Sequence, residues 1–341
     1  MVKTVGIDIG KSVFHLVGLD GQGRIVIKKR LSRVQLFVMS GNLAPCLIGL
    51  EACPGAHYLA RRLQSQGHTI RLLPPQYVRP YVKSHKNDFV DAEAIAEAVG
   101  RATMRFVAPK TVAQLDLQAL HRVRDRLVMR RTGLINQIRA FLLEQGLPLR
   151  SGRRVLQREL PGILVNQDAP ISARLRQLLG GLWQEWRVLE TQLSDVTATI
   201  EAVATEDQAC QRLLDVPGVG PLTATALVAA IGTGEAFRKG RDFASWLGLV
   251  PRQHSTGGKP RLLGISKRGN SHLRRLFVLG AHSVARHVAR ERHGFGAWLT
   301  RLQARTHPNV ATVALANKLA RIAWAVLRHG IPYRPGLRAA A

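Results

Sequence analysis

Acidic residues are scarce in this 341-residue sequence, which has 22 Asp and Glu against 50 Lys and Arg. The formal net charge is therefore +28 at pH 7. The positive charges of a folded protein with such an excess repel one another, so we expect a polyanionic partner. Nucleic acid is the first candidate. Arginine-rich coding from a GC-rich genome would explain the many basic residues, but not the lack of acids.

Cysteines and long apolar runs are also scarce. The three cysteines, Cys46, Cys53 and Cys210, form neither a CxxC pair nor a zinc-binding spacing, so we expect reduced, buried thiols. The opening MVKTVGIDIG lacks the charged-then-apolar pattern of a signal peptide. No apolar run reaches the roughly 18 residues of a membrane span. We expect a cytoplasmic bacterial protein that has no membrane partner and associates with the nucleoid when active.

The first hundred residues have an α/β pattern. Short apolar runs predict five strands, the first three as an antiparallel meander, at residues 5–9, 14–19, 25–29, 46–52 and 68–73. A helix is predicted at residues 56–66, where Gly67 ends it. A second helix runs from Asp88 to Val99, with Asp88 placed as its N-cap.

The rest of the chain has mainly helical periodicity. Long helices are predicted at residues 115–143 and 182–203, with a Gly- and Pro-broken piece at 148–170 between them. Such helices pack against each other or against a second subunit, and the sequence leaves both open. We predict an α/β domain at 1–108, a helical segment at 109–205 and a mainly α domain at 206–335.

Four acids of the first domain form a candidate metal site. Asp8 ends the first predicted strand, Glu51 ends the fourth, and Asp88 and Asp91 share one helix face. Asp8 and Glu51 interrupt apolar runs, where an acid needs a partner. The four carboxylates can meet on one rim of the sheet and hold two Mg²⁺ ions about 3.5–4 Å apart, a separation suited to phosphodiester chemistry.

Each acid alone is weak evidence for a metal site. Asp88, for example, is by itself more often a helix cap. The order of the four acids along alternating strands and helices is far more specific than any one of them. Nearby basic residues would attract a phosphate backbone, namely Arg79, Lys83 and Lys86.

The set resembles the signature of DEDD-type insertion-sequence transposases, in which Asp, Glu, Asp and Asp follow one another. The matching positions are Asp8 in GIDIGK, Glu51 in LEACPG, and Asp88 and Asp91 in KNDFVDA. The resemblance covers essentially the whole chain. It implies a RuvC-like, ribonuclease-H-like N-terminal domain and Mg²⁺-assisted cutting and joining of DNA.

Residues 213–232, LLDVPGVGPLTATALVAAIG, have a Pro-Gly-Val-Gly turn between two helical stretches. The pattern is typical of a helix-hairpin-helix element. Gly218 and Gly220 would let backbone amides approach a phosphate at the N-terminus of the following helix. An ordinary tight turn between two helices is the alternative.

The sequence HSTGG at residues 254–258 lies in a basic, glycine-rich loop. By itself it favours a solvated loop, because Ser, Thr and Gly are common there. However, the segment is similar to the transposase domain of the same DEDD group, whose members carry an essential serine in a Gly-Leu-x-Pro…Ser-Gly loop. GLVP at residues 248–251 matches the start of that loop. Counting from Pro251 without a gap aligns Thr256 with the essential serine of the family, whereas a one-residue shift aligns Ser255 with it. We choose Ser255 because its hydroxyl is less hindered.

Basic residues in and after this loop are expected to contact phosphates. They are Arg252, Lys259, Lys267, Arg268, Arg274 and Arg275.

The resemblance further implies an RNA-guided recombinase, in which a noncoding RNA from the element pairs with donor and target DNA. It implies serine attack through a covalent phosphoserine, in dimers that pair into a tetramer. Two other hypotheses remain open from the residues alone. One is a Holliday-junction-type nuclease that uses the carboxylates and water, and the other is a non-catalytic nucleic-acid-binding protein with structural acids.

Overall fold

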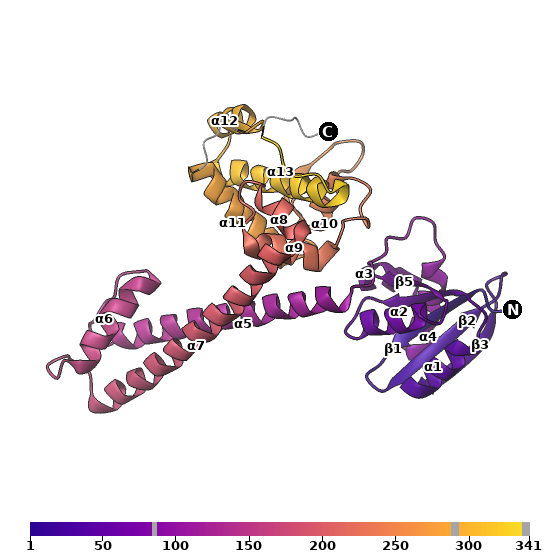
Figure 1. The fold of residues 1–341 in the computed structure, drawn as a ribbon, viewed down its shortest axis with the longest axis horizontal. Coiled ribbons are helices and arrows are strands. Elements are labelled where there is room, and N and C mark those ends of the chain that lie inside the picture. Colours follow the sequence, from indigo (N-terminus) through magenta and orange to yellow (C-terminus); the bar gives the residue numbers. More distant parts are fainter. Residues whose placement is uncertain (84–86, 288–292, 336–341) are drawn as a thin grey trace. The chain divides into compact units, whose positions relative to one another are not determined.

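The structure is a computed structural model that describes residues 1–83, 87–287 and 293–335 (Figure 1). The chain divides into two compact units, Met1–Val112 and Ala113–Ala341. The N-terminal unit is α/β, and the C-terminal unit is almost entirely helical.

The N-terminal unit is built on a five-stranded mixed sheet. Its strands are β1 (Thr4–Ile9), β2 (Val13–Leu19), β3 (Ile25–Ser32), β4 (Leu47–Glu51) and β5 (Thr69–Leu73), in the order β3-β2-β1-β4-β5. The first three are antiparallel neighbours, and β4 and β5 run parallel to β1. The predicted five strands and the meander are therefore confirmed.

Helices cover both faces of this sheet. Their bounds are α1 (Arg33–Gly41), α2 (Ala56–Gln64), α3 (Pro75–Val78), η1 (Arg79–Tyr81) and α4 (Asp88–Val99). Leu36 of α1 and Leu59 of α2 share one core with Ile7 and Leu50, whereas Ala92 and Ala96 of α4 pack on the opposite face. Helix α1 was not predicted, although Ser32 and Gln35 form a capping box at its start.

The N-cap of α4 differs from the prediction. Asn87 is the cap, since its side chain accepts a hydrogen bond from the Phe89 amide at 2.9 Å. Asp88 is instead the first helical residue. Its carboxylate is therefore not used in capping the helix, and it lines a cleft.

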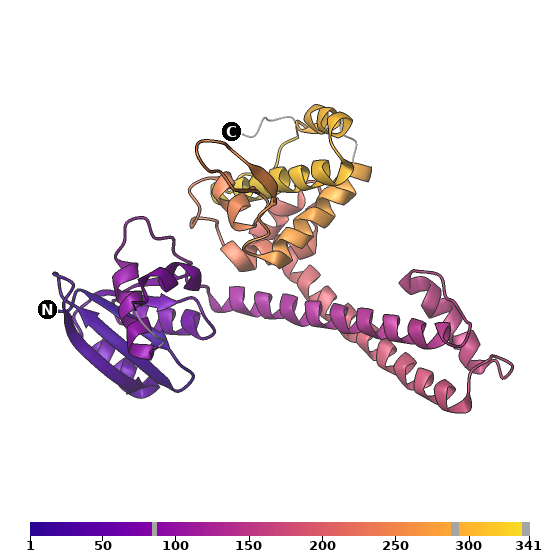
Figure 2. The ribbon, with the colours of Figure 1, turned by 180° about the vertical axis from the view of Figure 1, so that it is seen from behind.

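The C-terminal unit begins with three helices, α5 (Val112–Leu143), α6 (Arg153–Val165) and α7 (Ala173–Glu206). Helices α5 and α7 lie side by side (Figures 1 and 2). Ile138 of α5 is fully buried, and it belongs to the same apolar core as Leu156 of α6 and Leu189 of α7. The two long helices therefore pack against each other, which confirms one of the two arrangements that the sequence left open.

The bounds of these helices differ in part from the prediction. Helix α7 begins nine residues earlier, at Ala173 rather than residue 182, because Ser172 caps it by accepting a hydrogen bond from the Leu175 amide. The piece predicted to be broken contains α6, which accommodates Pro161 within it. Pro148, Gly152 and Pro170 thus flank this helix, whereas Pro161 and Gly162 lie inside it.

The remaining helices form a second core in this unit. They are α8 (Gln208–Leu214), α9 (Pro221–Ile231), α10 (Gly240–Trp246), α11 (Ser271–His287), α12 (Gly296–Arg305) and α13 (Pro308–His329). Helix α13 supplies much of this core, including Leu315 and Leu319. It is the one helix of the described residues that is long and apolar enough to cross a membrane, but 61% of its most apolar window is buried inside the unit. Burial of this kind is typical of a core helix.

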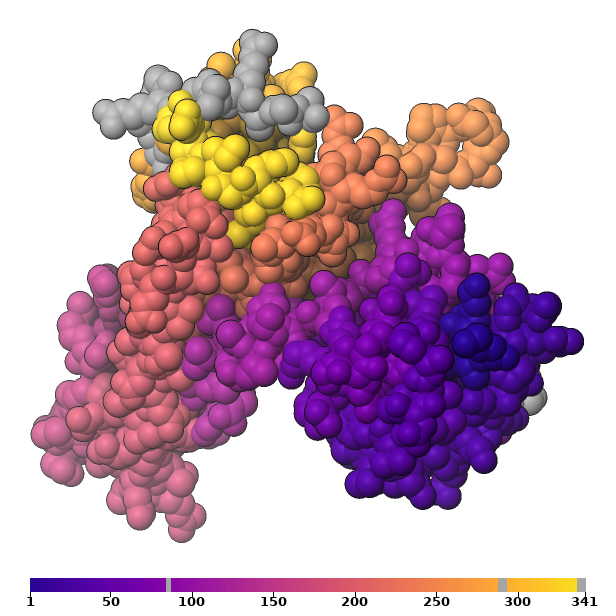
Figure 3. Space-filling model, turned by 45° about the vertical axis from the view of Figure 1, so that its right-hand side comes forward, coloured from indigo at the N-terminus to yellow at the C-terminus, as the bar shows by residue number. Residues whose placement is uncertain are grey.

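The glycine-rich basic segment is not a plain loop. Strands β6 (Pro251–Gln253) and β7 (Leu262–Ile265) pair antiparallel within it. The resulting hairpin projects from the body of the unit (Figures 2 and 3).

The three cysteines are all free thiols. Cys46 and Cys210 are buried as predicted, but Cys53 is only half-buried. Burial raises the pKa of the Cys210 thiol to about 12, so this group is an inert core residue.

Candidate functional site

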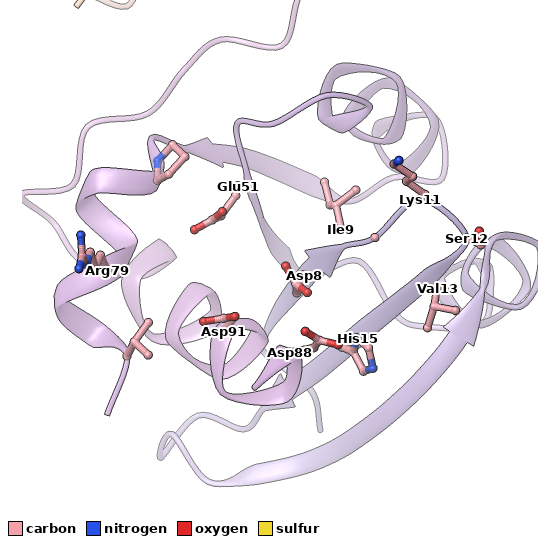
Figure 4. A pocket seen from close by; sticks show the side chains of 13 residues that line it. Asp8, Ile9, Lys11, Ser12, Val13, His15, Glu51, Arg79, Asp88 and Asp91 are labelled. Atoms are coloured by element: carbon pink, nitrogen blue, oxygen red, sulfur yellow. Dashed lines mark ion pairs between the residues drawn. The ribbon is translucent and has the colours of Figure 1, made fainter. Parts of the chain in front are cut away.

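A cleft of about 730 Å³ opens at one edge of the N-terminal sheet. Its lining includes all four acids predicted from the sequence: Asp8, Glu51, Asp88 and Asp91. Figure 4 shows the side chains of these acids directed into one space from β1, β4 and the start of α4. The structure thus brings together residues that are up to 83 positions apart in the chain, counting from 8 to 91.

Two glycines explain how α4 comes close enough to complete this cluster. Gly6 and Gly49 are register partners on the parallel strands β1 and β4. A Cβ atom at Gly6 would collide with the backbone of α4 at Ala92, and one at Gly49 would lie 2.9 Å from Val99 Cβ. Because side chains alternate along a strand, the residues two positions further on face the same helix.

Those residues are Asp8 and Glu51. The repeated pattern Gly-x-acid, in GID and GLE, therefore places a glycine against α4 and a carboxylate within electrostatic reach of Asp91. Asp88 and Asp91 face these acids because both lie in the first turn of α4.

Burial and repulsion by neighbouring acids both act on the two strand-borne acids, Asp8 and Glu51. Burial, and then the nearby Asp88 and Asp91, raise the pKa of Asp8 above its ordinary value. Burial, and then Asp8 and Asp91, raise the pKa of Glu51 in the same way. Half-buried carboxylates that repel one another are stabilised by a bound cation.

A histidine that the sequence analysis did not identify also lines the cleft. His15 of β2 is the register partner of Asp8, and its Nδ1 lies 3.5 Å from Asp88 Oδ2. One ligand atom each from Asp8, His15 and Asp88 lie within 4.8 Å of one another. The sequence feature that could have predicted this pairing is the tight turn at residues 10–12. This turn fixes the β1–β2 register and so pairs residue 8 with residue 15.

The predicted basic neighbours of the cleft have different surroundings. Arg79 lines the cleft together with Lys11. Lys83 instead pairs with Glu93 and Glu97 of α4. Lys86 lies outside the described residues.

The β6–β7 hairpin carries the second predicted catalytic group. Ser255 is exposed, and its Oγ accepts hydrogen bonds from Gln253 Nε2 at 2.8 Å and from the Arg261 amide at 3.3 Å. Thr256 is exposed as well and forms an isolated bridge with Lys259. Among the described residues, neither a carboxylate nor an imidazole accepts a hydrogen bond from the Ser255 hydroxyl.

The base of this hairpin is tightly packed. A Cβ atom at Gly248 would collide with the Arg268 backbone, and one at Gly269 would collide with the Trp246 carbonyl. Arg274 Nη1 donates to the carbonyl oxygens of Leu247 at 2.8 Å and Arg268 at 3.0 Å. It therefore joins the segments on both sides of the hairpin.

The other basic residues of this region are exposed, namely Arg252, Lys259, Lys267, Arg268 and Arg275. Arg275 Nη2 donates to Asp125 Oδ1 of α5 at 2.6 Å, and His272 Nδ1 lies 2.7 Å from the other oxygen of that carboxylate. Arg274 and Arg275 thus already have partners within the protein.

Comparison with known proteins shows the family to which this chain belongs. Residues 5–146 match the DEDD transposase model of IS110 elements, and residues 210–295 match the model described as "Transposase IS116/IS110/IS902 family". The chain belongs to this family of transposases.

Relatives of the transposase match over almost its entire length. A Pseudomonas aeruginosa protein named "Probable family 20 transposase" is 46% identical over 98% of this chain and 99% of its own length. The transposase of element IS1328 from Yersinia enterocolitica is 43% identical over 96% of this chain and 98% of its own. The IS1111A transposase of Coxiella burnetii is 44% identical, over 98% and 92% respectively.

Membership of the family makes this protein a DNA transposase, an enzyme of DNA recombination whose substrates are DNA. The DEDD domain implies a ribonuclease-H-like fold, which agrees with the mixed five-stranded sheet of the N-terminal unit. It also implies a divalent metal. The donor set of the cleft fits such an ion, because it consists of hard carboxylate oxygens and one imidazole nitrogen.

The turn between α8 and α9 of the transposase has a clear packing role. Gly218 has a φ of 76°, and a Cβ atom there would lie 2.7 Å from the carbonyl oxygen of Gly280 on α11. Gly220 is exposed and precedes the first turn of α9. The close contact accounts for the glycine at 218, and phosphate binding by this turn stays a prediction.

Proposed function

We propose that this transposase cuts and rejoins DNA with Asp8, Glu51, Asp88 and Asp91 as metal-binding catalytic acids and Ser255 as the nucleophile. The observation that carries the proposal is the meeting of all four acids in one cleft beside Arg79. Thr256 is the fallback nucleophile, since it is equally exposed on the same hairpin.

Mg²⁺ is the proposed cofactor. Asp8 and Glu51 would hold it from the strand ends, and Asp88 and Asp91 from the first turn of α4. A bound Mg²⁺ would offset the charge that develops on the phosphate oxygens during cleavage.

The proposed reaction begins with attack of the Ser255 hydroxyl on a DNA phosphodiester. The Ser255 oxygen would form a bond to phosphorus as it loses its proton, and the bond from phosphorus to a DNA oxygen would break as that oxygen gains a proton. The phosphodiester energy is retained in a phosphoserine, so that a DNA hydroxyl can reverse the reaction on a new strand. Ser255 is not bonded to a carboxylate or imidazole within the described residues, so we propose that it reacts at the carboxylate cleft of another subunit.

The proposed partners are donor DNA, target DNA and a noncoding guide RNA. The net charge of +28 supports the binding of several polyanions at once. The proposed phosphate contacts are Gly218, Gly220, Arg252, Lys259, Lys267, Arg268 and Arg275. Arg274, which was also expected to contact phosphate, instead has a proposed positioning role because it bonds across the base of the hairpin. We place this activity in the bacterial cytoplasm, on the nucleoid.

We propose a homodimer, with pairing of dimers into a tetramer, assembled through the long helices. Met129 of α5 is 66% exposed, and Leu178 and Val188 of α7 are each 56% exposed. Exposed apolar side chains on long helices favour contact with a second copy.

The acids are tested by Asp8→Asn and Glu51→Gln, each of which should abolish strand cleavage. Glu144→Gln, at an exposed acid just after α5, is the matched control and should leave cleavage unchanged. Cleavage that survives both substitutions in the cleft would remove the proposed metal site.

The nucleophile is tested by Ser255→Ala and Thr256→Val, with a denaturing gel to detect protein linked to DNA. We expect Ser255→Ala to lose the adduct and Thr256→Val to keep it, with Ser151→Ala as a matched control. Metal-dependent cleavage without any adduct would instead favour a nuclease that uses water. Salt-sensitive binding without cleavage would favour a non-catalytic nucleic-acid-binding protein.

The RNA is tested by sequencing nucleic acid that copurifies with the protein. A structured transcript from the DNA beside the gene, partly complementary to the element junctions, is expected. Recombination that proceeds at full rate after this RNA is removed would overturn RNA guidance while leaving the catalytic proposal intact.

A further inference from the structure

His15 lies inside the acidic cleft rather than beside it. It is the register partner of Asp8, and its side chain is only 12% exposed. Figure 4 shows its ring among the acids that line the cleft. A histidine in a cluster of carboxylates is either their ion-pair partner or a ligand to the same cation.

The surroundings of His15 fix the direction of its ring. The ring meets that of Phe89 edge to face, with 4.7 Å between the centroids. Phe89 is in turn covered by Lys28, whose Nζ lies 4.9 Å from the ring centroid. This packing holds the imidazole in place, so no large rearrangement is required to present Nδ1 toward Asp88.

The distances suit one cation. Ligand atoms of Asp8, His15 and Asp88 all lie within 4.8 Å of one another. Neighbouring ligands of an octahedral ion are roughly 3.0 Å apart and opposite ligands roughly 4.2 Å, since each bond is about 2.1 Å. The three ligand atoms would therefore draw together by about an ångström to share an ion.

We infer that His15 is a nitrogen ligand of the catalytic divalent cation and raises the affinity of the site for Mn²⁺ and Co²⁺ relative to its affinity for Mg²⁺. This inference rests on the proposed metal site and adds a ligand to it. An imidazole nitrogen is a softer donor than a carboxylate oxygen, and Mg²⁺ gains little from it.

A purely structural role predicts something different. If His15 only pairs with Asp88 and steadies the start of α4, its loss weakens the binding of every divalent ion by the same factor. If it is a ligand, its loss weakens the binding of Mn²⁺ and Co²⁺ much more than that of Mg²⁺.

The test is calorimetric titration of Mn²⁺ and Mg²⁺ into the full chain, its His15→Asn variant and the control His287→Asn. We expect His15→Asn to weaken Mn²⁺ binding by about tenfold or more and Mg²⁺ binding by less than about threefold. His287 is exposed at the end of α11, so its variant should bind both ions normally. Equal losses for both ions in His15→Asn would overturn the inference.

Pulsed electron paramagnetic resonance of bound Mn²⁺ gives a second readout, independent of activity. The wild type should show coupling to an imidazole ¹⁴N nucleus, and His15→Asn should lose it. Tight Mn²⁺ binding without this coupling overturns only the histidine ligand. A wild type that binds no divalent ion would overturn the proposed metal site itself.

Discussion

Gly6 and Gly49 lie side by side on β1 and β4, and α4 crosses directly over both. Neither glycine touches substrate in our proposal. Their lack of a side chain lets the first turn of α4 approach the ends of the two strands, where Asp8 and Glu51 lie. The geometry of the cleft therefore depends on two residues that have no functional groups.

The contact between β1 and α4 should not tolerate an added side chain. Gly6→Ala should destabilise the N-terminal unit by about 3 kcal/mol or more, since the added methyl group meets the backbone of α4. Chemical denaturation measures the loss. Gly21→Ala, at a turn with open space around it, should change stability little; a similar loss in both variants would contradict the packing argument.

Repulsion between the acids should lower the stability of the metal-free protein. Asp8→Asn should therefore raise its melting temperature, because it removes a half-buried charge near Asp88 and Asp91. The wild type, in contrast, should gain about 2.7 kcal/mol when the metal is present at 100 times its Kd. Differential scanning fluorimetry with and without Mg²⁺ checks both effects. A metal-free variant that melts below the wild type would show that Asp8 is not under repulsion.

Arg274 should position the hairpin rather than bind phosphate directly. Arg274→Ala should lower the yield of the DNA-linked adduct by about tenfold, because the base of the hairpin loses two hydrogen bonds from Arg274. Its DNA affinity should change little. Arg252→Ala should instead weaken DNA binding and reduce the salt slope by about one unit. Loss of affinity as the main effect of Arg274→Ala would make Arg274 a phosphate contact.

The buried His121 should make the stability of the C-terminal unit depend on pH. Burial, followed by His272 and Arg124, lowers the pKa of His121 to about 4. The unfolded chain takes up this proton near the ordinary value of 6.5, so the unit should lose stability as the pH falls from 6.5 towards 4. The loss should approach about 3 kcal/mol. His121→Gln should show a flatter dependence in urea unfolding between pH 7 and pH 5; identical curves would contradict it.

Local patterns were sufficient for much of the N-terminal unit. Apolar runs predicted the five strands, and the acids that interrupt them marked Asp8 and Glu51. The capping box at Ser32 is an equally local signal, and it could have predicted α1. The N-cap of α4 was predicted wrongly at Asp88 because Asn87 and Asp88 are both good caps, and only the helix geometry distinguishes them.

The sequence by itself determined the strands, the long helices, the excess of positive charge and the four acids, because each depends on neighbouring residues or on composition. The tertiary structure decided which groups meet. It set His15 beside Asp8, placed α4 on Gly6 and Gly49, and fastened the hairpin with Arg274. These contacts join residues that are far apart in the chain, and strand register and helix packing, rather than local pattern, determine them.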